Sequence, residues 1–202
     1  MKFGPLWFLA CACVLLAGCQ TSGPDEQPDA SPEDRRTSEA RGEDRAIERY
    51  GMTRIAERFG ERVNASVVSF NRLVLLVGAV PNAETRAEVQ KVVAAAEGVR
   101  GVTNEIEIAG VPSQNARASD AEIAAKVNAR FRAAGKFNPV HVRVVIQTGV
   151  VYLMGIVIEK EAEDAIELAR TTDGVRKVVK IFEYCKPTDE ACMPQAGSGA
   201  LR

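Results

Sequence analysis

The chain contains an internal repeat, and this repeat constrains the fold more than any other feature of the sequence. A strand-like apolar run ends at Gly78 in the first half and again at Gly155, 77 positions later (155 minus 78). Each run leads into a helix-like segment that ends in a Gly-Val-Arg turn, at Gly98 and at Gly174, 76 positions apart (174 minus 98). We therefore expect two units of about 70 residues, each near the lower size limit for a self-sufficient core.

The N-terminal segment has the pattern of a bacterial lipoprotein leader. Lys2 gives it a positive start, Leu6–Ala17 is an apolar run too short to span a bilayer, and small residues precede Cys19. We expect residues 1–18 to be a signal peptide and Cys19 to become the acylated N-terminus. The alternative is an ordinary secretory leader with an incidental cysteine. Because Gln20 rather than Asp follows the cysteine, the likeness to lipoproteins implies sorting to the outer membrane.

Residues 19–45 are predicted to be the acylated N-terminus and a disordered tether. The segment is rich in Pro, Ser, Asp, Glu and Arg and has no apolar periodicity. Residues 186–202 are predicted to form a flexible tail after Pro187. The formal net charge of the whole chain is -1, so its overall charge gives no bias toward nucleic acid or membrane.

Residues 46–110 predict the element order α-β-β-α-β. Four side chains of the first helix fall on one face at helical spacing: Met52, Ile55, Ala56 and Phe59. Periodicity and turn residues place a helix at 45–60, strands at 64–70, 73–78 and 102–108, and a second helix that starts after Pro81 and ends before Gly98.

Residues 116–185 predict the same order again, after a polar linker at 110–119. The first helix is expected from Ser119 to Phe137, with Ser119 or Asp120 as its cap. Strands are expected at 140–146, 150–157 and 175–184. The fold class is therefore α+β, with two tandem units in which a three-stranded mixed sheet packs against two helices.

The residues give no support for catalysis, for a metal or for a cofactor. His141 is the single histidine, and its position between Val140 and Val142 on a predicted strand indicates a side chain that faces solvent. One histidine makes a His/Cys zinc site implausible. The glycines lack the spacing of loops that bind phosphates. We therefore expect neither an enzyme nor a small-molecule substrate.

The cysteines divide by position. Cys11 and Cys13 leave with the leader, and Cys19 is the acylation site. Cys185 and Cys192 remain, and as a pair they suit one disulfide in an oxidising compartment. Two free thiols are the alternative.

The paired strand–Gly–helix–Gly-Val-Arg-x-Val pattern resembles the BON domain family, named for bacterial osmotically induced and nodulation proteins. The resemblance covers about residues 46–184, and a lipobox followed by two such units is similar to the dual-BON outer-membrane lipoproteins. The resemblance implies a non-enzymatic protein that binds anionic phospholipid through the first helix of the second unit. It also implies a place at the division site and a contribution to outer-membrane integrity.

The residues of that helix fit lipid binding in part. Candidate lipid-binding residues are Lys126, Arg130, Arg132, Lys136 and Phe137. Basic groups near an anionic surface are attracted to it, and an anchor at Cys19 would raise their effective concentration. However, Glu122 stands where the family has an aromatic residue, which removes an insertion anchor and adds repulsion. An ordinary solvated helix face is the alternative.

A second class of function is also open. A periplasmic protein-interaction scaffold that assists outer-membrane protein assembly or the envelope stress response would show the same sequence without binding lipid headgroups. Attraction to lipid should weaken at high ionic strength, whereas an apolar protein contact should not.

Overall fold

The computed structural model describes residues 34–189 and residue 192. The predicted signal peptide, the acylation site Cys19, residues 19–33 of the predicted tether and most of the predicted tail (190–191 and 193–202) lie outside the described residues.

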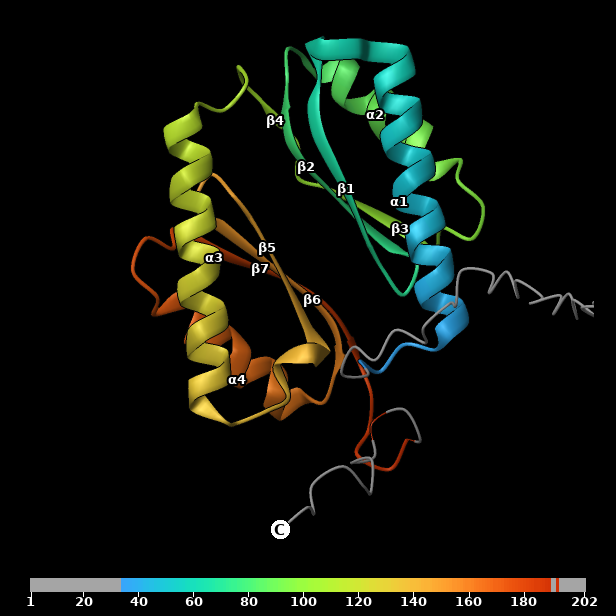
Figure 1. Cartoon of the computed structure of the whole chain (residues 1–202). Helices are drawn as coiled ribbons and strands as arrows, with labels where there is room; N and C mark the ends of the chain where they lie inside the picture. The colour runs from blue at the N-terminus through green and yellow to red at the C-terminus, as the bar shows by residue number, and fades with distance from the viewer. Residues whose placement is uncertain (1–33, 190–191, 193–202) are drawn as a thin grey trace, which may run out of the picture. The chain divides into compact units, whose positions relative to one another are not determined.

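The first unit has the predicted order of elements. Its helices are α1 (Ser38–Phe59) and α2 (Ala83–Ala94), with a 3-10 turn η1 (Gly60–Arg62) after α1. Its strands are β1 (Asn64–Phe70), β2 (Leu73–Val80), β3 (Gly101–Asn104) and β4 (Glu107–Ile108). β1 and β2 form an antiparallel hairpin, and β3 and β4 both pair in parallel with β2. Both helices lie on the same face of this sheet (Figure 1).

The last strand of the first unit is interrupted where the sequence predicts a continuous one. The Asn104 side chain donates to the carbonyl of Arg86 (3.2 Å) and accepts from the backbone N–H of Ile106 (3.2 Å). These side-chain bonds compete with the sheet ladder. Ile106 is buried in the core at this point. The strand therefore consists of two short segments, β3 and β4.

The buried face of α1 differs from the predicted one. Met52 is exposed at 44%, and Ala56 is exposed as well. The face that packs on the sheet is formed by Ile47, Gly51, Ile55 and Phe59. A Cβ atom on Gly51 would lie 3.1 Å from the Val67 methyl groups, so the missing side chain lets the helix approach the sheet closely.

The predicted tether is wrong for its last residues, because α1 begins at Ser38 rather than Arg45. The hydroxyl of Thr37 caps the helix by accepting from the N–H of Ala40 (3.1 Å). Asp44 is only 2% exposed and accepts hydrogen bonds from the N–H groups of Asn71 and Arg72 (2.7 Å each). These partners are distant in sequence, so a polar segment without apolar periodicity is nevertheless ordered.

The second unit repeats the architecture. Its helices are α3 (Gln114–Ala134) and α4 (Glu159–Arg170), and its strands are β5 (Val142–Gln147), β6 (Val150–Val157) and β7 (Lys177–Tyr184). The sheet order is β5-β6-β7, with β5 antiparallel and β7 parallel to β6. α3 begins five residues before the predicted cap, because the hydroxyl of Ser113 accepts from the N–H of Ala116 (3.2 Å). A 3-10 turn, η2 (Pro139–His141), precedes β5.

Each sheet uses its two faces differently. One face packs on the helices of its own unit. The other faces meet in a third apolar cluster, in which Phe70, Leu75 and Val77 of the first sheet join Tyr152 and Met154 of the second. Polar links surround this cluster. They run from Arg143 to Glu48 (2.9 Å), from Asn71 to Glu183 (2.7 Å) and from Arg100 to Glu183 (2.8 Å).

Candidate functional site

The outer surface of α3 is the site predicted from sequence. Ile123, Val127 and Phe131 are buried and fix the rotation of the helix. The opposite surface is lined by small exposed residues four positions apart: Ala121, Ala125, Ala129 and Ala133. Longer basic side chains flank this row. They therefore project beyond the rest of the surface.

The four predicted basic residues have different surroundings. Lys126 is exposed and pairs with Glu122 one turn earlier (2.7 Å). Arg130 donates to the hydroxyl groups of Thr172 and Thr171 (2.9 Å each), which ties it to the end of α4. Arg132 is exposed, and within the described part of the chain it forms no ion pair.

Lys136 belongs to a separate cluster beyond the end of α3. Its ammonium group lies 3.0 Å from Asp164, whose other oxygen lies 3.0 Å from Lys160. Hydrogen bonds from Lys160 and Lys136 lower the pKa of Asp164 below its usual value. The two ammonium groups and the one carboxylate of this cluster together carry a net charge of +1.

Phe137 is a core residue, and its predicted role at the lipid surface is wrong. It is 8% exposed, and its ring stacks edge-on against Phe131 with centroids 5.1 Å apart. The αL conformation of Gly135 (φ 59°) reverses the chain after α3 and turns Phe137 inward. No aromatic anchor therefore remains among the predicted lipid-binding residues.

Glu122, the acid at the position of the family's aromatic residue, has its charge balanced by Lys126. Hydrogen bonding and charge from Lys126 lower the pKa of Glu122, and Glu122 raises the pKa of Lys126. Asp120, the other acid near the start of this surface, accepts from the backbone N–H groups of Thr148 (2.7 Å) and Gly149 (2.8 Å). Among the described residues no acid pairs with Arg130 or Arg132; Arg132 is exposed, whereas Arg130 is partly buried against the end of α4.

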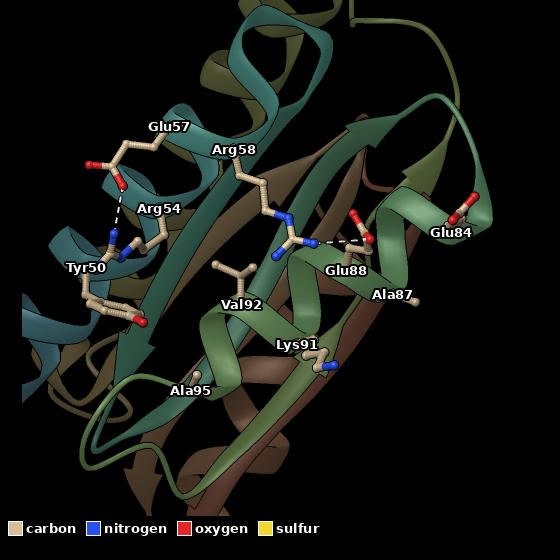
Figure 2. A pocket seen from close by; sticks show the side chains of 10 residues that line it. All are labelled: Tyr50, Arg54, Glu57, Arg58, Glu84, Ala87, Glu88, Lys91, Val92 and Ala95. Carbon is tan, nitrogen blue, oxygen red and sulfur yellow. Dashed lines mark hydrogen bonds and ion pairs between the residues drawn. The ribbon is translucent and has the colours of Figure 1, made fainter.

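A groove between α1 and α2 is a site that the sequence analysis missed. It encloses about 690 Å³. Figure 2 shows Tyr50 and Val92 along its length, with Arg58 extending from α1 toward Glu88 on α2. Arg58 and Glu88 pair across the groove at 3.2 Å, and the guanidinium of Arg54 lies 5.5 Å from the centroid of the Tyr50 ring. No local pattern signals the groove, because it arises where two helices meet.

His141 is also placed differently from the prediction. It ends η2 rather than lying in a strand, and its side chain is only 16% exposed. Its Nδ1 atom lies 3.5 Å from Oε1 of Glu161 and has no hydrogen-bond partner among the described residues. Burial lowers the pKa of His141, and the nearby charge of Arg35 lowers it further. The histidine is therefore enclosed rather than facing solvent.

Between residues 34 and 189, and at residue 192, no three His, Cys, Asp or Glu side chains gather as they would around a metal ion. None of the helices in that part of the chain is both long and apolar enough to cross a bilayer.

The structure brings together the two C-terminal cysteines. Cys185 and Cys192 are joined as a disulfide, with Cα atoms 6.2 Å apart. Cys192 is buried, and its N–H donates to the carbonyl of Asp189 (2.8 Å). That the two thiols are oxidised to this disulfide in the purified protein stays a prediction.

The model of the BON domain family matches residues 53–110 and 119–186, well over half of the chain. Outer membrane lipoprotein DolP of Haemophilus influenzae is 33% identical over 123 residues, which are 61% of this chain and 63% of that protein. The aligned region is thus less than two thirds of that relative's length. A 21 kDa hemolysin of Actinobacillus pleuropneumoniae is 28% identical over 156 residues, 76% of this chain and 80% of its own.

Solved structures of CdsD, a structural protein of the type III secretion system of Chlamydia trachomatis, are more distant. Two of them are 14% identical, with a TM-score of 0.29, and cover 70% and 71% of this chain. They cover 91% and 96% of the CdsD chains. A TM-score this low adds nothing to the account of the fold.

Proposed function

The chain belongs to the BON domain family, and from this premise we propose that it is a non-enzymatic outer-membrane lipoprotein whose second BON domain binds anionic phospholipid. The likeness to DolP supports the location and the lipid anchor, which the sequence assigns to Cys19. In this proposal the protein helps to maintain outer-membrane integrity and acts at the division site.

The observation that supports lipid binding is the shape and charge of α3. Its outer surface is a row of alanines, so a flat headgroup layer can approach the helix closely. Lys126 and Arg130 lie on one side of the row and Arg132 lies toward the other, near the helix C-terminus. Each basic group near an anionic surface gains attraction to it.

The proposed contact is electrostatic and shallow. Phe137 is buried, and Glu122 occupies the position of the family's aromatic residue, so neither supplies an anchor within the acyl chains. Binding of the second domain alone is then weak. The anchor at Cys19 makes it effective, because a tethered site meets the surface at high local concentration.

Vesicle binding under two salt conditions tests the proposal. The chain without residues 1–18 and with Cys19→Ser has no lipid of its own. We expect it to bind vesicles that contain phosphatidylglycerol, and not phosphatidylcholine vesicles, at about 0.1 M salt. Binding should be lost near 1 M salt, where the Debye length falls from about 10 Å to about 3 Å. Binding that is equal on both vesicles, or absent from both, contradicts the proposal.

A second candidate function rests on the groove of the first domain. Its walls combine the apolar surface of Tyr50 and Val92 with three basic and three acidic side chains: Arg54, Arg58, Lys91, Glu57, Glu84 and Glu88. Grooves between helices commonly accept an amphipathic helix of a partner protein. The second candidate function is thus a protein-interaction scaffold that assists outer-membrane protein assembly. It predicts that binding of a partner protein persists at high salt.

A further inference from the structure

The N-terminal residues 34–36, here called the strap, contact both domains. Arg36 is held by the first domain: its Nη1 lies 2.9 Å from Asp44, and its guanidinium lies 4.1 Å from the centre of the Phe70 ring. Arg35 points to the second domain instead, where its Nη1 donates to the carbonyl of Ile156 (3.1 Å). The strap therefore links the two domains directly at the root of the membrane tether.

The main contact of the strap with the second domain is a buried ion pair. Arg35 and Glu161 form a two-point pair, in which Nη2 lies 3.1 Å from Oε1. Their side chains are 9% and 11% exposed. Oε2 of Glu161 also accepts from the N–H of Ile158 (3.0 Å) at the start of α4. Removing one partner from such a buried pair leaves an uncompensated charge, which is strongly unfavourable.

His141 approaches one of the two carboxylate oxygens of Glu161 that Arg35 uses. Its Nδ1 lies 3.5 Å from Oε1 of Glu161. Nδ1 is buried and has no hydrogen-bond partner within the described part of the chain, so in the neutral form it adds no bond to the pair. In the protonated form Nδ1–H becomes a charged donor aimed at Oε1, and it places a second cation beside Arg35.

We propose that the strap is a proton-sensitive latch, in which protonated His141 takes Oε1 of Glu161 from Arg35 and frees the strap from the second domain. The charged groups that face His141 are Arg35, Glu161 and Asp34. The contacts of Arg36 with the first domain involve no histidine, so they persist. Acid therefore loosens the link between the domains at the root of the tether, which goes beyond the proposed lipid binding.

The direction of the effect follows from the pKa of His141. Burial lowers this pKa most, the charge of Arg35 lowers it further, and Glu161 and Asp34 oppose both effects. The latched state therefore binds fewer protons than the released state below the ordinary histidine pKa of about 6.5. The latch keeps its full stability above that pH and loses stability as the pH falls below it. The chain has one histidine, so no other imidazole contributes.

Proteolysis of the strap in the full chain in detergent micelles tests the latch. Trypsin cleaves after Arg35 only when the strap is free. Cleavage, normalised to a reference peptide in the same tube, should rise severalfold between about pH 7.5 and about pH 5, because protonation of His141 favours the released strap. His141→Gln keeps a similar polar side chain that does not titrate, and it should show no such rise. A rise in both chains, or in neither, overturns the latch.

An NMR titration keeps the test decisive if His141→Gln does not fold. In the native chain, the single imidazole and the Nε–H signal of the Arg35 side chain should titrate with the same midpoint. An Arg35 signal that does not change through the imidazole midpoint overturns the latch.

Discussion

Asp120 accepts two backbone hydrogen bonds from the β5–β6 turn, and Asp44 accepts an equivalent two from the β1–β2 turn. The donors are the N–H groups of Thr148 and Gly149 in the second domain and those of Asn71 and Arg72 in the first. The turns begin with non-glycine residues of positive φ, 51° at Thr148 and 50° at Asn71. Such backbone is costly unless its surroundings hold it. The two aspartates are thus a repeated device that fixes each hairpin to the preceding helix.

Replacing the aspartates by asparagine should destabilise the chain unequally. The asparagine side chain has nearly the same size as aspartate, but its NH2 group replaces one acceptor oxygen. This NH2 donor would face a backbone N–H donor of the turn. Asp44 also accepts from Ser69 and pairs with Arg36, so we expect Asp44→Asn to cost about 3 kcal/mol and Asp120→Asn about 1 to 2 kcal/mol. Urea unfolding measures both. Equal and negligible losses would show that the turns hold without the carboxylates.

Alanine at either repeated glycine should be poorly tolerated. A Cβ atom on Gly78, which has a φ of 129°, would lie 2.8 Å from the Cα of Ala65, and one on Gly155 would meet the backbone of His141 and Val142. We expect each substitution to lower the free energy of unfolding by about 2 to 4 kcal/mol. Gly42→Ala is the control, because nothing lies within 4 Å of its added Cβ. Its effect should stay near zero or be slightly stabilising.

Phe137→Ala should affect stability and leave the intrinsic lipid contact unchanged. Truncation of a buried phenylalanine creates a cavity beside Phe131 and costs about 3 to 5 kcal/mol. Phe137→Leu retains most of the volume and should cost less. Thermal unfolding gives the stability, and vesicle binding by the folded fraction of Phe137→Leu should match that of the parent chain. Weaker binding by this variant at unchanged stability would show that Phe137 contributes to the contact with lipid.

The C-terminal cysteines should resist alkylation until they are reduced. Thiol labelling of the purified protein, followed by mass spectrometry, should modify Cys185 and Cys192 only after treatment with a reductant. Cys185→Ser should free Cys192 for labelling. Full labelling of the native chain without reductant would show that the pair is not oxidised.

The sequence predicts the tandem fold well because the repeat and the alternating apolar residues determine local structure. Turn residues such as Asn71 and Gly149 gave the hairpins nearly to the residue. The early start of α1 could not be predicted in the same way. Residues 38–45 are polar, and the buried positions of Ala40 and Asp44 depend on tertiary contacts with a distant turn.

The site was predicted less completely than the fold. The basic residues of α3 are visible in the sequence, but their pairing partners, such as Asp164 for Lys136, come from another helix. Phe137 follows a helix among polar residues, and only packing against Phe131 shows that it is buried. The sequence spacing of Asp44 and Asp120, 76 positions (120 minus 44), matches the glycine repeat and could have revealed their shared role.

Charge reversal on α3 is the most direct test of the proposed lipid binding. Arg132→Glu should weaken binding of the Cys19→Ser chain to phosphatidylglycerol vesicles by at least about tenfold, since it changes two units of charge near the surface. Arg49→Glu makes the same change at an exposed position on α1 of the first domain and should leave binding nearly unchanged. Equal losses in the two variants, or no loss in either, would contradict recognition of the membrane by α3.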